Sequence, residues 1–239
     1  MNLMVRPSKS FLYDLLQAEL FKLQGEVGLD AASANFKNRR MFKTNRYYGL
    51  DIRLDLLQIG LQKYQDENTF GIHADLVSLH KIPENSVDAL VSTNTLHQIP
   101  FEKRKAAIEE LCRICSPTGT FICELTLDAS FDGTMSIINE KFSNITVQYY
   151  SNPISRFYEG MFEKEGYLGT HPIAGTRPFR ALAWLISRLE FLTCKIRGIN
   201  RHAFVIAGKK RGSPSAQKFN LSSLPIIEER IFEMMKHDS

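Results

Sequence analysis

Apolar residues in the first half of the chain recur at two spacings, one typical of helices and the other typical of strands. Residues 10–23 carry leucine and phenylalanine at helical spacing and predict an amphipathic helix. The short apolar runs that follow predict strands, and the amphipathic segments between them predict helices. Strands are predicted at 26–30, 47–52, 69–74, 87–92 and 120–125, with helices at 54–64 and 101–114 and a helix or turn at 35–43.

The pattern is looser after residue 127. Alternating residues predict a strand at 144–150 and a last strand at 202–208. Helices are predicted at 153–165, at 180–195 and, as an amphipathic terminal helix docked on the body, at 224–236.

An acidic residue closes three successive strands of the first half: Asp30, Asp51 and Asp75. In open α/β sheets, ligands bind in a crevice at the carboxyl ends of parallel strands, where helix N-termini also point. A carboxylate accepts hydrogen bonds from both hydroxyls of a ribose, which an aliphatic side chain cannot do. The three acids therefore predict a cofactor that carries an adenosine.

Composition narrows the class of protein. The chain has 239 residues, of which 44% are hydrophobic and 23% charged, enough to build a core. We expect the four cysteines to be buried, reduced thiols, and a cytoplasmic protein without a secretory signal or a membrane span. A net charge of +4 does not by itself indicate nucleic acid, so no nucleic-acid partner is expected. The basic cluster at 37–46 leaves a role on RNA as an alternative interpretation.

Three motifs have the order found in one enzyme family. They are RYYGLDI, FGIHADLVSLHKIPENSVDALVSTNTLHQI and RKAAIEELCRICSPTGTFIC. Over 25–127 the chain resembles the class I S-adenosylmethionine-dependent methyltransferases of the small-molecule type, and 202–210 is similar to the closing antiparallel strand of that family. The resemblance implies an α/β fold with a Rossmann-like, seven-stranded, mostly parallel sheet, helices on both faces and a helical insertion before the last strand.

The resemblance also divides the chain. It implies an N-terminal helix at 1–24, a cofactor-binding core at 25–127, a substrate or cap region at 128–201, a closing strand at 202–211 and a linker with a C-terminal helix at 212–239. The implied cofactor is S-adenosyl-L-methionine, and the implied activity is methyl transfer to a small molecule or a glycan.

Cofactor contacts are implied at the ends of the strands. Asp51 lies 21 positions after Asp30, as expected of a ribose-binding carboxylate, although it is also placed to cap the next helix. Asp75 would accept from the adenine amino group. The complete set is Asp30, Ala31, Ala32, Asp51, Ile52, Ala74, Asp75, Leu76, Thr93 and Asn94.

The first loop departs from the family pattern. It reads VGLDAASAN from Val27, with Ala31, Ala32 and Ala34 where the family has a glycine-rich turn. A Cβ hinders positive φ angles and close approach to a ligand. We therefore expect either lowered cofactor affinity or a different path of the turn. The alternative function is a catalytically degenerate protein with a binding or scaffold role.

His97 follows the fourth strand and is the candidate general base, because histidine titrates near neutral pH. The alternative is a structural histidine. The spacing of the six histidines predicts no metal site.

The region 128–201 carries side chains suited to an acceptor pocket, or equally to an ordinary helical cap. The helix at 180–195 has three interpretations: packing on the sheet, a homodimer face, or contact with anionic lipid. The candidate acceptor residues are Tyr149, Tyr150, Phe157, Tyr158, Phe162, Tyr167, Arg156, Arg177 and Arg180.

Overall fold

The computed structural model describes residues 4–162, 172–212, 215–221, 226–228 and 230–234. It contains two compact units. One unit, which we call the helical unit, comprises Met1–Glu19 and Val147–Phe204. The other, which we call the sheet unit, comprises Leu20–Thr146 and Val205–Ser239.

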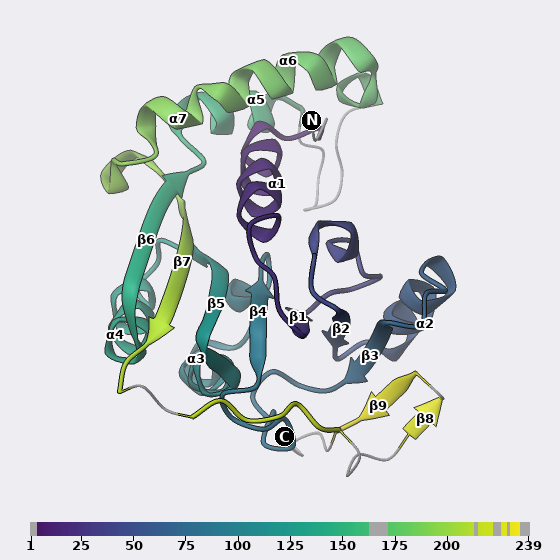
Figure 1. Cartoon of the computed structure of the whole chain (residues 1–239). Helices are drawn as coiled ribbons and strands as arrows, with labels where there is room; N and C mark the ends of the chain where they lie inside the picture. Colours follow the sequence, from purple (N-terminus) through teal and green to yellow (C-terminus); the bar gives the residue numbers. More distant parts are fainter. Residues whose placement is uncertain (1–3, 163–171, 213–214, 222–225, 229, 235–239) are drawn as a thin grey trace. The chain divides into compact units, whose positions relative to one another are not determined.

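The described residues form a nine-stranded sheet in the order β6-β7-β5-β4-β1-β2-β3-β9-β8 (Figure 1). Five strands lie where the first half of the sequence predicts them, because each contains a short apolar run that is buried in the sheet, although β5 begins five residues earlier than predicted. They are β1 (Val27–Ala31), β2 (Arg46–Asp51), β3 (Thr69–His73), β4 (Val87–Ser92) and β5 (Cys115–Thr126). The second half adds β6 (Phe142–Tyr150), β7 (His202–Lys210), β8 (Ile226–Glu228) and β9 (Ile231–Glu233).

The central strands β3, β2, β1, β4 and β5 are neighbours and pair in parallel. The chain moves outward from β1 through β2 to β3, and then returns to the other side of β1 as β4. The loops after β1 and β4 therefore diverge, which leaves a crevice at their carboxyl ends. The predicted Rossmann-like α/β fold is confirmed.

Two helices of the sheet unit pack beside these strands, and a third helix packs on one of the two. In Figure 1, α2 (Leu54–Lys63) lies beside β2 and β3, and α3 (Phe101–Ile114) lies near β5. α4 (Phe131–Lys141) packs against α3. The sequence predicted α2 and α3. It missed α4, although Phe131 and Ile138 mark its buried face at a spacing of seven residues.

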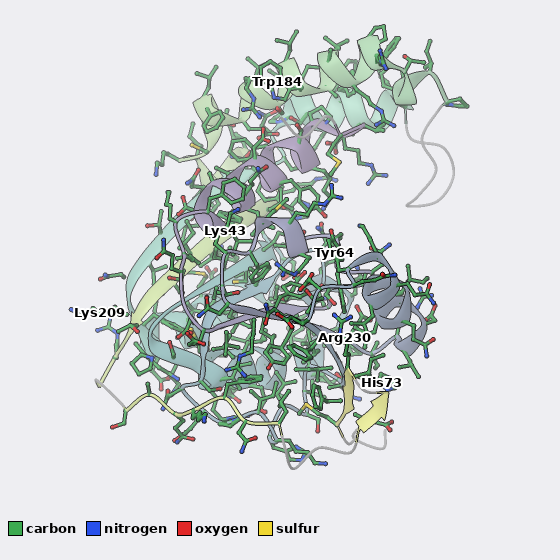
Figure 2. The ribbon with its side chains drawn as sticks, turned by 45° about the vertical axis from the view of Figure 1, so that its right-hand side comes forward. Lys43, Tyr64, His73, Trp184, Lys209 and Arg230 are labelled. Atoms are coloured by element: carbon green, nitrogen blue, oxygen red, sulfur yellow. The ribbon has the colours of Figure 1, made fainter. Side chains whose placement is uncertain are left out.

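Two sequence predictions are wrong at the C-terminal end. The sheet has nine described strands instead of seven, and β8 and β9 form an antiparallel pair where a helix was predicted. β9 pairs in parallel with β3, whose edge would otherwise present unpaired backbone groups. The Arg230 guanidinium donates hydrogen bonds to the carbonyl oxygens of Tyr64, Asp66 and Thr69, which holds the hairpin at this edge (Figure 2). These contacts outweigh the helical periodicity of the segment.

The helical unit is built from α1 (Pro7–Leu20), α5 (Pro153–Phe162), α6 (Arg177–Arg188) and α7 (Glu190–Thr193). Phe11 of α1 is fully buried, and its ring lies 4.9 Å from that of Phe191. The helix predicted at 180–195 is present as α6 and α7. In the described residues, no helix is both long and apolar enough to cross a membrane.

The units differ from the predicted segments in two respects. Residues 128–146, which contain α4, belong to the sheet unit, and the N-terminal helix belongs with the cap helices. All four cysteines are free and buried, as predicted, and burial raises the pKa of Cys112 and Cys115 to about 12.

Candidate functional site

A cavity of about 470 Å³ lies at the carboxyl ends of β1, β2, β3 and β4 in the sheet unit. Its size is within the usual range of small-molecule sites, roughly 300–1,000 Å³. Each of the four strand ends contributes to the lining. The residues are Ala32, Ala34, Lys37, Leu50, Asp51, Ile52, Arg53, Leu56, Ala74, Asp75, Leu76, Val77, Asn94, Thr95, Gln98, Ile99, Pro100 and Lys103.

Asp51 ends β2 and organises two loops at the cavity. Its Oδ2 accepts a hydrogen bond of 2.8 Å from the backbone N–H of Ala34, and its Oδ1 accepts one of 2.9 Å from that of Arg53. The N-cap residue of α2 is Arg53, and it makes no side-chain capping bond, so the alternative that Asp51 caps this helix is wrong. Each carboxylate oxygen has a second lone pair, and the side chain lines the cavity. Asp51 can therefore bind a ligand hydroxyl while it holds both loops.

Asp75, two residues after the end of β3, also lines the cavity. Its Oδ1 accepts a hydrogen bond of 3.2 Å from the Val77 N–H, which fixes the turn. Ala74 and Leu76 flank it and are nearly fully buried, whereas Ile52 from the neighbouring strand is 54% exposed. A carboxylate between apolar side chains is suited to a flat ring that carries an exocyclic amine.

The alanine turn after β1 adopts the angles that glycine normally supplies. Ala32, Ala34 and Phe36 have φ angles of 60°, 50° and 58°. Left-handed angles cost roughly 1–2 kcal/mol for each non-glycine residue. The structure thus keeps a left-handed turn here, at a cost in stability that glycine would avoid.

Phe36 anchors this turn in the sheet unit. Its side chain is fully buried, and its ring lies 5.4 Å from that of Tyr47. The space exists because Gly49 and Gly60 have no side chain: a Cβ on Gly49 would lie 2.2 Å from the ring, and one on Gly60 would lie 2.6 Å from it. Between β1 and β2 every residue is described, and the only helical turn there is the 3₁₀ turn Arg39–Met41. A buried phenylalanine therefore anchors the first loop where doubly wound folds have a helix.

The predicted cofactor role of Asp30 is not supported by its position. Asp30 is 1% exposed and is not among the residues that line the cavity. Its carboxylate accepts hydrogen bonds from the Asn38 amide at 3.2 Å and the Tyr47 hydroxyl at 3.1 Å. Burial raises the pKa of Asp30 to about 6, against the opposing effects of Lys37 and the two hydrogen bonds. The alternation of β1 turns this acid toward the buried side of the loop.

Ala31 and Thr93 are also buried and do not line the cavity. The structure brings together the other seven residues predicted to bind the cofactor. They are Ala32, Asp51, Ile52, Ala74, Asp75, Leu76 and Asn94.

The loop after β4 is held by two buried or half-buried charges. Asn94 has a φ angle of 59°, and its N–H donates a hydrogen bond of 2.8 Å to Oε2 of Glu124, which is itself buried. Arg104 of α3 donates to the carbonyl oxygens of His97 and Ile99, and forms an ion pair of 2.8 Å with Asp128. These contacts fix the cavity wall formed by the β4 loop.

His97 lies outside the large cavity. It lines a separate hollow of about 10 Å³, which has room for at most one water molecule. Within the described part of the chain, no histidine lines the large cavity. The predicted role of His97 as general base gains no support from this geometry, because a base must reach the proton that it removes.

Sequence reasoning missed three basic side chains at the cavity. Lys37, Arg53 and Lys103 line it together with Asp51 and Asp75. Arg53 forms an exposed ion pair of 2.6 Å with Asp55. The site thus offers both cationic and anionic groups, as a zwitterionic ligand requires. In the sequence, Lys37 stands out only as part of a basic cluster. Lys103 reaches the cavity only through the fold. Among the described residues, no group of three His, Cys, Asp or Glu could hold a metal ion.

Comparison with known proteins identifies relatives of this architecture. Residues 27–123 match the protein family described as a methyltransferase domain. No curated protein matches the sequence. Three solved structures have the same fold at low sequence identity.

The geranyl diphosphate C-methyltransferase from Streptomyces coelicolor A3(2), solved with Mg²⁺, geranyl diphosphate and S-adenosyl-L-homocysteine, has a TM-score of 0.55 at 11% identity over 84% of this chain and 80% of that chain. The YcgJ protein from Bacillus subtilis has a TM-score of 0.53 at 14% identity over 85% and 98%. The [4+2]-cyclase SpnF has a TM-score of 0.54 at 15% identity over 84% and 80%. At such identities, the likeness establishes the fold alone, and the chemistry has to be inferred from the residues of the site.

Proposed function

Because this chain has the fold of the class I S-adenosylmethionine-dependent methyltransferases and carries a methyltransferase domain at 27–123, we propose that it transfers a methyl group from S-adenosyl-L-methionine to a small molecule or a glycan. The observation that carries the proposal is the 470 Å³ cavity with Asp51 and Asp75 on adjacent strand ends. This is the crevice at which doubly wound sheets bind nucleotide-like ligands.

The residues present fit this cofactor. Asp51 would hold the ribose hydroxyls through its remaining lone pairs, and Asp75 would accept from the adenine amino group between Ala74 and Leu76. Lys37 and Lys103 would attract the carboxylate of the methionine part. Glycine is not required, since Ala32 and Ala34 already have the positive φ angles that the turn needs.

Methyl transfer demands alignment more than acid–base machinery. When bound, S-adenosyl-L-methionine would supply a methyl group on a positively charged sulfur: the acceptor lone pair would bond to the methyl carbon, and the sulfur would leave as the neutral thioether of S-adenosyl-L-homocysteine. Proximity and orientation can supply much of the rate acceleration. The chain's task is then to fix the cavity walls, which Asp51, Asn94 and Arg104 do through the contacts described above. His97 remains a proposed base, for an acceptor hydroxyl, with its position outside the cavity against it.

The acceptor class rests on the comparisons and on composition. The Streptomyces coelicolor relative is named for a small-molecule acceptor, geranyl diphosphate. The helical unit contributes the candidate acceptor residues Phe157, which is 71% exposed, and Tyr158, which is buried. Tyr167 lies outside the described residues. We place the protein in the cytoplasm, with no nucleic-acid partner.

The second candidate is a degenerate member that keeps the fold and has lost catalysis. Two observations favour it: the first loop has a single 3₁₀ turn in place of an α-helix, and Asp30 faces the core. The likeness to a protein named as a [4+2]-cyclase illustrates that this fold serves other chemistry.

Isothermal titration with S-adenosyl-L-methionine and S-adenosyl-L-homocysteine tests the proposal. We expect micromolar binding of both. The Asp75→Asn variant should bind at least tenfold more weakly, and the exposed Glu67→Gln variant should bind as the wild type does. A protein that circular dichroism finds folded, and that binds neither compound, would favour the degenerate alternative.

A further inference from the structure

The outer side of α6 and α7 carries an exposed row of leucines. Leu182, Leu185, Leu189 and Leu192, which we call the leucine stripe, recur at intervals of three or four residues. Leu189 joins the two helices and keeps helical angles (φ −68°, ψ −18°), so the row continues from one to the next. Leu182, Leu185 and Leu192 are 43%, 57% and 77% exposed. Figure 1 shows α6 and α7 as successive parts of one extended segment, drawn in green.

The opposite side of the same segment is its inner face. Ala183, Ser187 and Glu190 are buried there, and Glu190 accepts hydrogen bonds from the backbone N–H of Asn152. The leucine stripe therefore points away from the packed side of its own unit. A helix of a globular protein normally buries its apolar stripe and exposes its polar side, and here the arrangement is reversed.

The segment that carries the leucine stripe is mostly basic, although one of its arginines, Arg188, forms an ion pair with Asp14 of α1. Residues 172–201 contain one acid, Glu190, and it is buried. Arg188 stacks on the ring of Trp184 at 5.0 Å, and Trp184 marks this part of α6 in Figure 2. The six basic residues of this segment are Arg177, Arg180, Arg188, Lys195, Arg197 and Arg201.

We propose that the leucine stripe docks this protein on the surface of an anionic lipid bilayer. An amphipathic helix with leucine on one side and lysine or arginine beside it lies in the interfacial plane, with its apolar side among the acyl chains. The basic side chains then meet the lipid phosphates, which complements their charge. A two-fold homodimer through this face would instead set the same basic residues against each other, which disfavours it.

Flotation of the purified full chain with vesicles tests the proposal, using phosphatidylcholine alone or mixed with phosphatidylglycerol. We expect flotation only with the anionic mixture, and less of it as salt rises. The Leu185→Asp/Leu192→Asp variant should lose at least tenfold in vesicle affinity. Ile59→Asp, at a comparably exposed apolar residue of α2, should leave affinity unchanged.

A charge variant gives a second measurement in case the leucine variant does not fold. Lys195→Glu should weaken anionic-vesicle binding by about fivefold or more, since a basic residue near such a surface contributes about 1 kcal/mol. Lys105→Glu, on the exposed side of α3, is the matched control. Absence of flotation with any vesicle overturns the proposal, as does flotation that neither variant alters. A dimer in sedimentation equilibrium that Leu185→Asp dissociates, without vesicle binding, also overturns it and assigns the face to a second copy. Vesicle binding needs no cofactor, so this test is independent of the proposed methyltransferase activity.

Discussion

Replacing Gly60 by alanine tests whether Phe36 anchors the first loop. Gly60 is a buried residue inside α2, where an ordinary helix would gain about 1 kcal/mol from Gly→Ala. Here the new Cβ would lie 2.6, 2.7 and 2.9 Å from three ring atoms of Phe36. Carbon atoms are best separated by about 3.5–4.0 Å, so the ring must move by about 1 Å.

The ring has little room to move. It is fully buried, and Gly49 lies so close to it that a Cβ built there would be 2.2 Å from the ring. Overpacking of this kind costs about 1–3 kcal/mol. Set against the helical gain, we expect the free energy of unfolding to fall by about 1 kcal/mol. Because Ala34 and Lys37 flank Phe36 and line the cavity, cofactor affinity should fall as well.

Urea denaturation followed by circular dichroism measures the effect. Gly133→Ala in α4 is the matched control, since nothing lies within 4 Å of the added Cβ, and it should stabilise the protein. The double variant Phe36→Leu/Gly60→Ala should lose less free energy of unfolding than the two single variants lose together. If Gly60→Ala stabilises the protein as Gly133→Ala does, Phe36 is not confined as we describe.

Three further outcomes follow from the site. Asp51→Ala should weaken cofactor binding in titration calorimetry. It should also lower the free energy of unfolding by about 1–3 kcal/mol, because it leaves the N–H groups of Ala34 and Arg53 unsatisfied. Unchanged affinity would remove Asp51 from the site. The Asp30 pKa of about 6 exceeds the ordinary 3.8, so its protonated form stabilises the fold below pH 4 and this stability, about 3 kcal/mol, is lost as pH rises through 6. Denaturation across that range should show Asp30→Asn gaining relative to the wild type as pH rises, and a constant difference would contradict the shift. If His97 is the base, His97→Ala should reduce turnover on the true acceptor by about a hundredfold or more and leave cofactor affinity nearly unchanged, and a loss of less than tenfold would make His97 structural.

The sequence predicted the central strands because burial of a strand leaves a local trace. The runs at β2, β3 and β4 are short, apolar and closed by turns, so their pattern survives whatever packs on them. Asp51 and Asp75 were found for the same reason: an acid at the end of a predicted strand has its place fixed by that strand. The structure indeed sets both in one cavity.

Other features depend on residues that are distant in the sequence. Asp30 lies one residue before the end of β1, but Tyr47 and Asn38 hold it toward the core. Lys103 reaches the cavity only because β4 returns beside β1. The C-terminal segment has helical periodicity and yet pairs with the edge of β3.

The alanine turn joins both kinds of information. The sequence predicted strain in this turn, because alanine lacks the conformational freedom of glycine. The positive φ angles of Ala32 and Ala34 show that the strain lies there. What holds those angles is Phe36, whose ring fills space left by Gly49 and Gly60 on two other elements. Local pattern therefore determined which segments become strands and helices, while the role of each side chain was decided by tertiary packing, because contacts between distant residues set its direction and its neighbours.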